Sequence, residues 1–149
     1  MISAAEQYFV ETFIRKDRQE RLLYELAKPK KRYDGVSRFC HQAKELLDPD
    51  LIVMEGEDMD RSPEFERFVQ THGEDCYLIS PDSFVDGLSL PLKDAVHSAV
   101  MCPDAVVIIG NKFAVVFGEP MKGGRGKYLL SERKLHGYEK IDPYKGYDA

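Results

Sequence analysis

The sequence has no long apolar segment. None of its hydrophobic runs approaches the ~20 residues that a membrane-spanning helix requires, although 43% of its 149 residues are hydrophobic. The N-terminus also lacks the basic region followed by an apolar one that is typical of a secretory signal. We therefore expect a cytoplasmic protein that does not enter a membrane.

Cysteine is scarce, and no familiar catalytic or metal-binding motif is present. The three cysteines, Cys40, Cys76 and Cys102, lie far apart in the sequence and form no CxxC pair. No histidine stands at the spacing of a zinc site, and no serine lies in a nucleophile elbow. We expect reduced, buried thiols, no bound metal and no cofactor.

Charge is unevenly distributed along the chain. The formal net charge is −5. Residues 1–38 contain nine Lys and Arg against six Asp and Glu, whereas residues 48–75 contain two against ten. A basic N-terminal part and an acidic middle indicate an electrically polarised molecule, which bears on partners and association rates rather than on the fold.

The most apolar stretch, residues 105–118, predicts the centre of the fold. Two runs rich in Val, Ile and Phe flank Gly110 and Asn111, a pair that suits a tight turn with positive φ. The pattern predicts a hairpin of strands 105–109 and 112–118, followed by a third strand at 127–130. Because these strands are almost wholly apolar, both of their faces should be covered.

The rest of the chain predicts the elements that provide this cover. Ser3 and Glu6 have the spacing of a capping box, which predicts a helix start. We expect one long helix, or two joined near Lys16, that ends before Pro29. The other predicted helices are 29–47, whose inner stripe includes Tyr33, 62–72, which Ser62 caps, and 89–101.

Strands 51–55 and 76–80 enclose the 62–72 helix, which predicts a right-handed parallel crossover. The expected fold class is α+β: a mixed sheet of about five strands that ends in an antiparallel meander. N-terminal helices and two crossover helices would cover this sheet. We expect one globular domain in residues 1–131 and an extended or mobile tail in residues 132–149.

Carboxylates follow both strands of the predicted crossover. Glu55, Glu57, Asp58 and Asp60 lie at the end of the first strand, and Asp82 follows the second. If the strands are parallel, both groups emerge at the same edge, where open α/β sheets bind ligands. Such carboxylates suit a basic protein partner, or a Mg²⁺ or Mn²⁺ ion.

A glycine-rich loop offers a candidate anion site. Its members are Lys122, Gly123, Gly124, Arg125 and Lys127. Glycines let backbone amides approach an anion, and the neighbouring cations add to the attraction. The spacing is not that of a Walker A loop, because Tyr128 stands where Ser or Thr is required. A flexible hairpin loop explains the same composition.

The sequence favours a non-enzymatic interaction protein of a bacterial-type cytoplasm. It would bind a basic protein partner through the acidic middle, as a toxin-neutralising or regulatory protein does. The first alternative is a divalent-metal-dependent enzyme acting on phosphodiesters or nucleotides, with Glu55, Asp58 and Asp82 as ligands. The second is a nucleic-acid-binding module that uses the basic N-terminal helices.

Overall fold

The computed structural model describes residues 2–120 and 124–132. Within them the chain forms six α-helices and an antiparallel sheet of six strands, in the order β1-β6-β5-β4-β2-β3. The helices are α1 (Ala4–Phe13), α2 (Lys16–Ala27), α3 (Pro29–His41), α4 (Ala43–Leu46), α5 (Pro63–Thr71) and α6 (Leu92–Met101). The strands are β1 (Ile52–Glu55), β2 (Asp75–Ile79), β3 (Ser89–Pro91), β4 (Val106–Ile109), β5 (Phe113–Phe117) and β6 (Lys127–Ser131). The predicted α+β class is confirmed.

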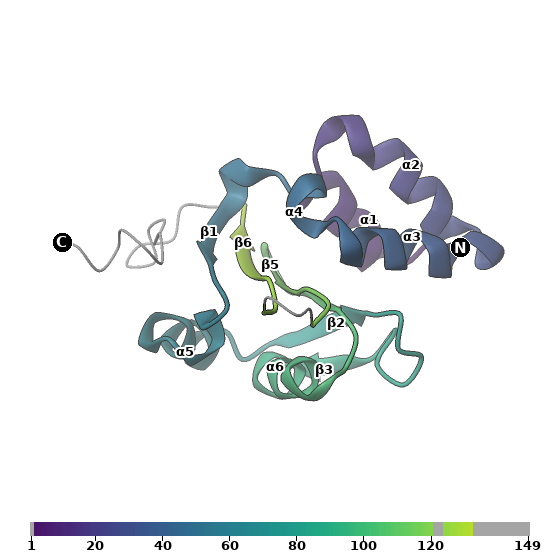
Figure 1. The fold of residues 1–149 in the computed structure, drawn as a ribbon. Coiled ribbons are helices and arrows are strands. Elements are labelled where there is room, and N and C mark those ends of the chain that lie inside the picture. The colour runs from purple at the N-terminus through teal and green to yellow at the C-terminus, as the bar shows by residue number, and fades with distance from the viewer. Residues whose placement is uncertain (1, 121–123, 133–149) are drawn as a thin grey trace.

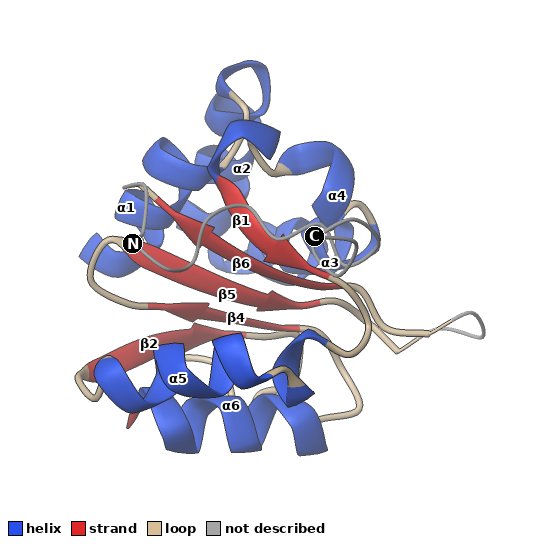
Figure 2. Ribbon diagram, turned by 90° about the vertical axis from the view of Figure 1, so that its left-hand side faces the viewer, coloured by secondary structure: helices blue, strands red, loops and turns tan. Residues whose placement is uncertain are grey.

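The described residues form three layers, with α1–α4 on one face of the sheet and α5 and α6 on the other (Figures 1 and 2). Successive residues of β4 alternate between two apolar cores. Val107 and Ile109 pack with α1–α4, whereas Val106 and Ile108 pack with α5 and α6. The prediction that both faces of the central strands are covered is confirmed, and this double cover explains their lack of polar residues.

The central hairpin forms as predicted, with Val106 opposite Phe117 and Ile109 opposite Ala114. Its turn differs from the prediction, because Lys112 has the positive φ (70°) and Gly110 does not. Glycine is required at Gly110 for another reason. A Cβ there would lie 2.2 Å from the ring of Phe113, which folds back under the turn and is buried.

The N-terminal part forms two helices before Pro29, the second of the two predicted arrangements. Ser3 and Glu6 make both hydrogen bonds of the capping box, each at 3.1 Å. The predicted 29–47 helix is interrupted at Gln42, whose backbone leaves the helical region. Tyr33, predicted on the inner stripe, is 65% exposed.

Two predictions about the sheet are wrong. Strands β1 and β2 point the same way but do not pair, because β6, β5 and β4 lie between them. Residues 89–91 form strand β3, which pairs with β2, where a helix start was predicted. The periodicity of the sequence does not predict β3. A segment of three residues that includes a proline forms a strand only because β2 lies beside it. Pro91 is tolerated because β3 is an edge strand.

No described helix combines the length and apolar character needed to cross a membrane. Of the predicted tail 132–149, all but Glu132 lies outside the described residues. All three predicted buried cysteines are free thiols, and all are buried. Burial is the main cause that raises the pKa of Cys40 and of Cys76 to about 12.

An ion pair between a buried carboxylate and a partly exposed guanidinium joins α2 to α3. Arg38 Nη1 donates to Glu25 Oε2 at 2.6 Å, and Arg38 Nη2 donates to the other carboxylate oxygen. The Glu25 side chain is only 10% exposed. The hydrogen bonds from Arg38 hold the pKa of Glu25 below its usual value, against the opposing effect of burial. Ionised Glu25 therefore stabilises the packing of the two helices.

Gly110→Ala should destabilise the fold, because the added methyl group collides with the buried ring of Phe113. Overpacking of this kind costs about 1–3 kcal/mol. The matched control is Gly73→Ala, since no atom lies within 4 Å of a Cβ at that position. Urea denaturation measures both changes. Equal free energies of unfolding for the two variants would contradict this account of the turn.

Arg38→Met should cost about 1.5–3 kcal/mol at neutral pH, the range for hydrogen bonds to a charged group. The folded pKa of Glu25 is lowered, so its stabilising effect is present above its unfolded pKa. That effect disappears as the pH falls through the lower folded pKa. The gap between wild type and variant, followed by urea denaturation, should therefore narrow on acidification. Arg18→Met, which removes a cation exposed beside Asp17, should show no such trend.

Candidate functional site

The carboxylates singled out in the sequence lie at one edge of the sheet. Strands β1, β5 and β2 end there, and β6, β4 and β3 begin there, as the antiparallel registers require. Four connections meet at this edge: residues 56–62, 80–88, 102–105 and 118–126, of which 121–123 lie outside the described residues. They contain seven Asp and Glu against three Lys and Arg. We call these four connections the acidic edge.

The candidate carboxylates near β1 differ in their burial and in the groups that lie beside them. Asp60 is nearly buried and accepts a hydrogen bond of 2.7 Å from Lys127 Nζ. Glu55 lies 3.3 Å from Lys44. Asp58 is 81% exposed and lies 3.5 Å from Arg61, which is also exposed. Glu57 is exposed too, and its carbonyl rather than its carboxylate binds Lys127. Glu57 therefore presents the open negative charge of this turn, and Asp58 shares its exposed position with the cation of Arg61.

Asp82 is held at the far end of the same edge. Its Oδ1 accepts from the Phe84 amide at 2.9 Å, and its own amide donates to Ser80 Oγ at 3.1 Å. Its Oδ2 lies 3.6 Å from Cys102 Sγ. Burial, together with Asp82, raises the pKa of the Cys102 thiol, which disfavours a reactive thiolate.

The strand order separates Asp82 from the carboxylates near β1. Strands β1 and β2 are four places apart in the sheet, which corresponds to about 19 Å at ~4.8 Å per strand. Among residues 2–120 and 124–132, no three His, Cys, Asp or Glu side chains are grouped so that they can hold a metal ion. The alternative with Glu55, Asp58 and Asp82 as joint ligands therefore gains no support from the arrangement of these side chains.

Two cations of the predicted anion loop, Arg125 and Lys127, are directed into the protein. Arg125 donates to the carbonyls of Gly118, Ala99 and Asp104, at 2.6, 2.9 and 2.8 Å. It thereby joins the end of α6 to both central strands, and burial lowers the pKa of Arg125.

Lys127 is likewise used internally, since its Nζ donates to the Glu57 carbonyl at 2.6 Å and to Asp60. Gly124 has a φ of 115° and lies against the Glu57 carboxylate. Lys122 and Gly123 lie outside the described residues. Anion binding by this loop stays a prediction, and the contacts of Arg125 and Lys127 do not favour it.

Several cations of the basic N-terminal part also have partners within the protein. Arg38 is paired with Glu25, and Arg15 Nε donates to the Leu47 carbonyl at 3.2 Å. Arg32 lies between the carboxylates of Glu6 and Asp86. The exposed cations that remain alternate with acidic residues, so nucleic-acid binding stays a prediction without added support.

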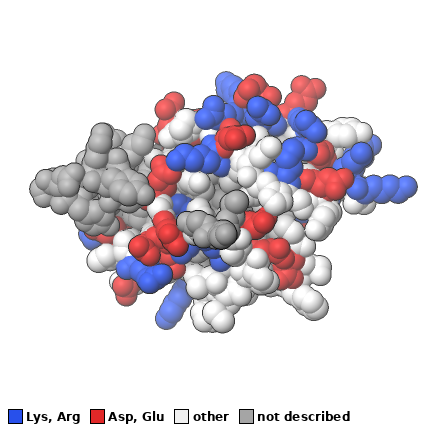
Figure 3. Space-filling model, in the orientation of Figure 1, with Lys and Arg blue, Asp and Glu red and all other residues white. Residues whose placement is uncertain are grey.

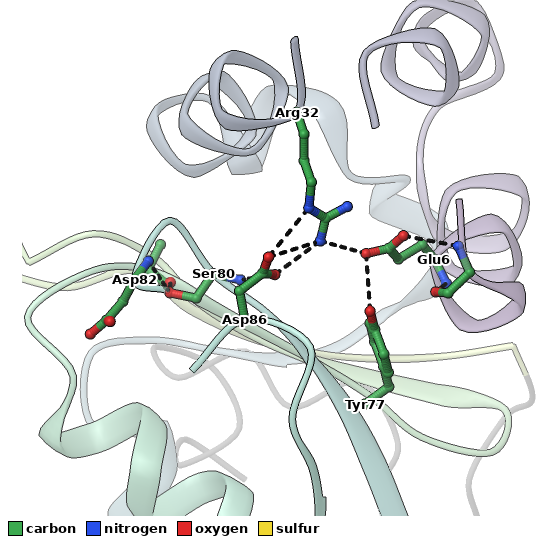
Figure 4. A network of polar contacts seen from close by, with 8 residues as sticks. Glu6, Arg32, Tyr77, Ser80, Asp82 and Asp86 are labelled. Carbon is green, nitrogen blue, oxygen red and sulfur yellow. Dashed lines mark hydrogen bonds and ion pairs between the residues drawn. The ribbon is translucent and has the colours of Figure 1, made fainter. Parts of the chain in front are cut away.

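The sequence did not reveal a polar network between the helices and the sheet (Figure 4). Arg32 on α3 bridges Glu6 on α1 at 2.6 Å and Asp86 in the β2–β3 connection at 2.9 Å. Tyr77 on β2 donates to the same Glu6 carboxylate at 3.4 Å. Burial opposes the charge on Arg32, but the hydrogen bonds to Asp86 and Glu6 raise its pKa.

This network borders a cavity of about 490 Å³ between α1, α3 and β2. Glu6 also belongs to the capping box, and that local role is all that its sequence context indicates. Nothing in the spacing of Glu6, Arg32 and Asp86 shows that they meet. The network fixes the β2–β3 connection, and therefore one end of the acidic edge, to the helical layer.

Lys127→Met should cost about 3–5 kcal/mol, because it leaves the nearly buried Asp60 carboxylate without its cation. The matched control is Lys44→Met, which removes a 72% exposed cation from Glu55 and should cost less than ~1 kcal/mol. Urea denaturation measures both variants. A second change, Asp60→Asn, should recover part of the loss in the Lys127→Met background. Equal, small effects of both lysine substitutions would show that Lys127 does not hold the edge together.

Comparisons with known proteins assign this chain to no group. It matches no protein-family model, and neither the curated proteins nor the solved structures contain a significant match to it. Its function therefore has to be inferred from the acidic edge and its contacts.

Proposed function

We propose that this chain is a non-enzymatic protein-binding module that captures a basic protein partner through the acidic edge. Toxin-neutralising and regulatory proteins are examples of this class. The observation that carries the proposal is the different treatment of the two signs of charge at this edge. Lys127 and Arg125 are directed inward, whereas Glu57 and Asp58 are exposed, with the exposed Arg61 lying 3.5 Å from Asp58.

This difference gives the edge an outward negative potential. The hydrogen bonds of Arg125 and Lys127 hold their charged groups against carbonyls and against Asp60. Asp82, Asp104 and Glu119 add negative charge along the same edge, and none of the three is buried. Such a concentration of one sign attracts an oppositely charged protein and speeds its association.

The dimensions of the edge also favour a protein as the ligand. Six strands end or begin along it in the described residues, so its carboxylates extend over about 20 Å, given ~4.8 Å per strand. A single small ion contacts only a few of them at once. A basic protein surface of ordinary interface size covers the whole row.

Charge reversal tests the proposal. Wild type, Glu57→Lys/Asp58→Lys and the control Asp17→Lys/Glu20→Lys are used to capture proteins from a lysate of the source organism. The control changes the net charge equally, but on exposed positions of α2. The captured protein is identified and purified, and its Kd for each variant is measured by calorimetry at low and physiological ionic strength.

We expect a basic partner whose Kd rises about tenfold or more in the edge variant, with a much smaller change in the control. Its affinity for wild type should also fall as salt is added. Equal binding by the wild type and the edge variant would overturn the proposal. Capture of no basic protein by the wild type would overturn it as well.

A further inference from the structure

A second exposed feature lies on the acidic edge, beside its carboxylates. Phe84, in the β2–β3 connection, is 88% exposed. The segment around it is nevertheless tightly held. Val85 is buried in the core with α6, and the Val85 and Asp86 amides both bond to the Asp82 carbonyl, at 3.0 and 2.9 Å. Arg32, in the helical layer, forms an ion pair with Asp86. The aromatic ring is therefore kept outward by a fixed loop.

Other exposed apolar side chains come from elements next to Phe84. The apolar patch consists of Phe84, Leu88, Val100 and Met101, which are 88, 40, 43 and 72% exposed. Val100 and Met101 end helix α6, and the next residue, Cys102, contacts Asp82 at 3.6 Å. That contact places the end of α6 against the Phe84 loop. In the view of Figure 3, the surface over α6 and this loop is mostly uncharged.

We propose that the apolar patch is the anchoring point of the basic partner, which presents an apolar side chain flanked by lysine or arginine. This inference rests on the proposed function and adds the chemistry of the partner. An aromatic side chain on a fixed backbone segment makes a strong anchor, because it has few rotatable bonds and loses little conformational entropy when it is covered. The carboxylates of Asp82 and Asp104, next to the patch in sequence, favour basic neighbours of the inserted group.

Charge also distinguishes this occupant from a second copy of the chain. A twofold dimer that buries the patch would bring two acidic edges together. The four connections of each copy carry seven acidic against three basic residues. Lys127 and Arg32 neutralise Asp60 and Asp86, and the remaining excess of acidic residues makes the two edges repel each other. A partner with basic residues around an apolar one avoids that repulsion.

Three synthetic peptides of equal length test the inference by fluorescence anisotropy: a lysine–leucine peptide, a lysine–serine peptide and a glutamate–leucine peptide. We expect the lysine–leucine peptide to bind wild type roughly tenfold more tightly than the lysine–serine peptide. The glutamate–leucine peptide should bind least. Phe84→Ser/Met101→Ser should remove the preference for leucine and leave the lysine–serine peptide unaffected.

The control is Tyr24→Ser, which removes an aromatic side chain that is 56% exposed on α2 and should keep the preference. Unchanged urea midpoints will show that all variants are folded. If leucine gives no preference in wild type, or if Phe84→Ser/Met101→Ser retains it, the apolar anchor is overturned while charge-dependent binding still stands. If the lysine–serine peptide also binds the Glu57→Lys/Asp58→Lys variant unchanged, the proposed function itself fails.

Sedimentation velocity tests whether a second copy of the chain covers the apolar patch. We expect wild type and Phe84→Ser/Met101→Ser to sediment alike as monomers at the concentrations used for binding. A wild-type dimer that dissociates in this variant would show that a second copy covers the patch, and would overturn the inference.

Discussion

The structure depends on the burial of strands β4 and β5 from both sides. A strand without polar residues has no face that tolerates water, so helices must cover the sheet above and below. Helices α1–α4 supply one cover and α5 and α6 the other. Because α5 follows β1 and α6 follows β3, the chain crosses repeatedly between layers and edges. The connections at the acidic edge are consequences of this arrangement.

Each connection at that edge is anchored by a charged side chain that points inward. Lys127 holds the β1–α5 turn. Arg125 joins the end of α6 to the start of β4 and the end of β5, and Arg32 holds the β2–β3 connection through Asp86. Backbone carbonyls at strand ends need donors, and long cationic side chains reach them. The charged groups of these three cations bond to groups within the protein. Glu57, Asp58 and Phe84 are exposed at the same edge. The residues that anchor the connections therefore also determine which side chains are exposed at this edge.

Features that depend on neighbours in the sequence were predictable. The central hairpin, the Ser3–Glu6 capping box and the Ser62 cap of α5 all form, because turn and cap chemistry acts over a few residues. Features that depend on partners far away in the sequence were not predictable. The parallel crossover failed because β6, the last described strand, pairs with β1. Arg125 and Lys127 looked like an anion site because sequence spacing does not show which carbonyls and carboxylates they meet.

The sequence by itself determined the α+β class, the two-sided burial of strands β4 and β5 and the concentration of carboxylates after β1 and β2. These are properties of composition and short-range pattern, and periodicity records them directly. The tertiary structure alone decided the strand order, the exposure of Phe84 and the distribution of charge between inward anchors and the outward surface. Those outcomes depend on contacts between residues tens of positions apart, such as Arg32 with Glu6 and Asp86. Only folding brings such groups within bonding distance.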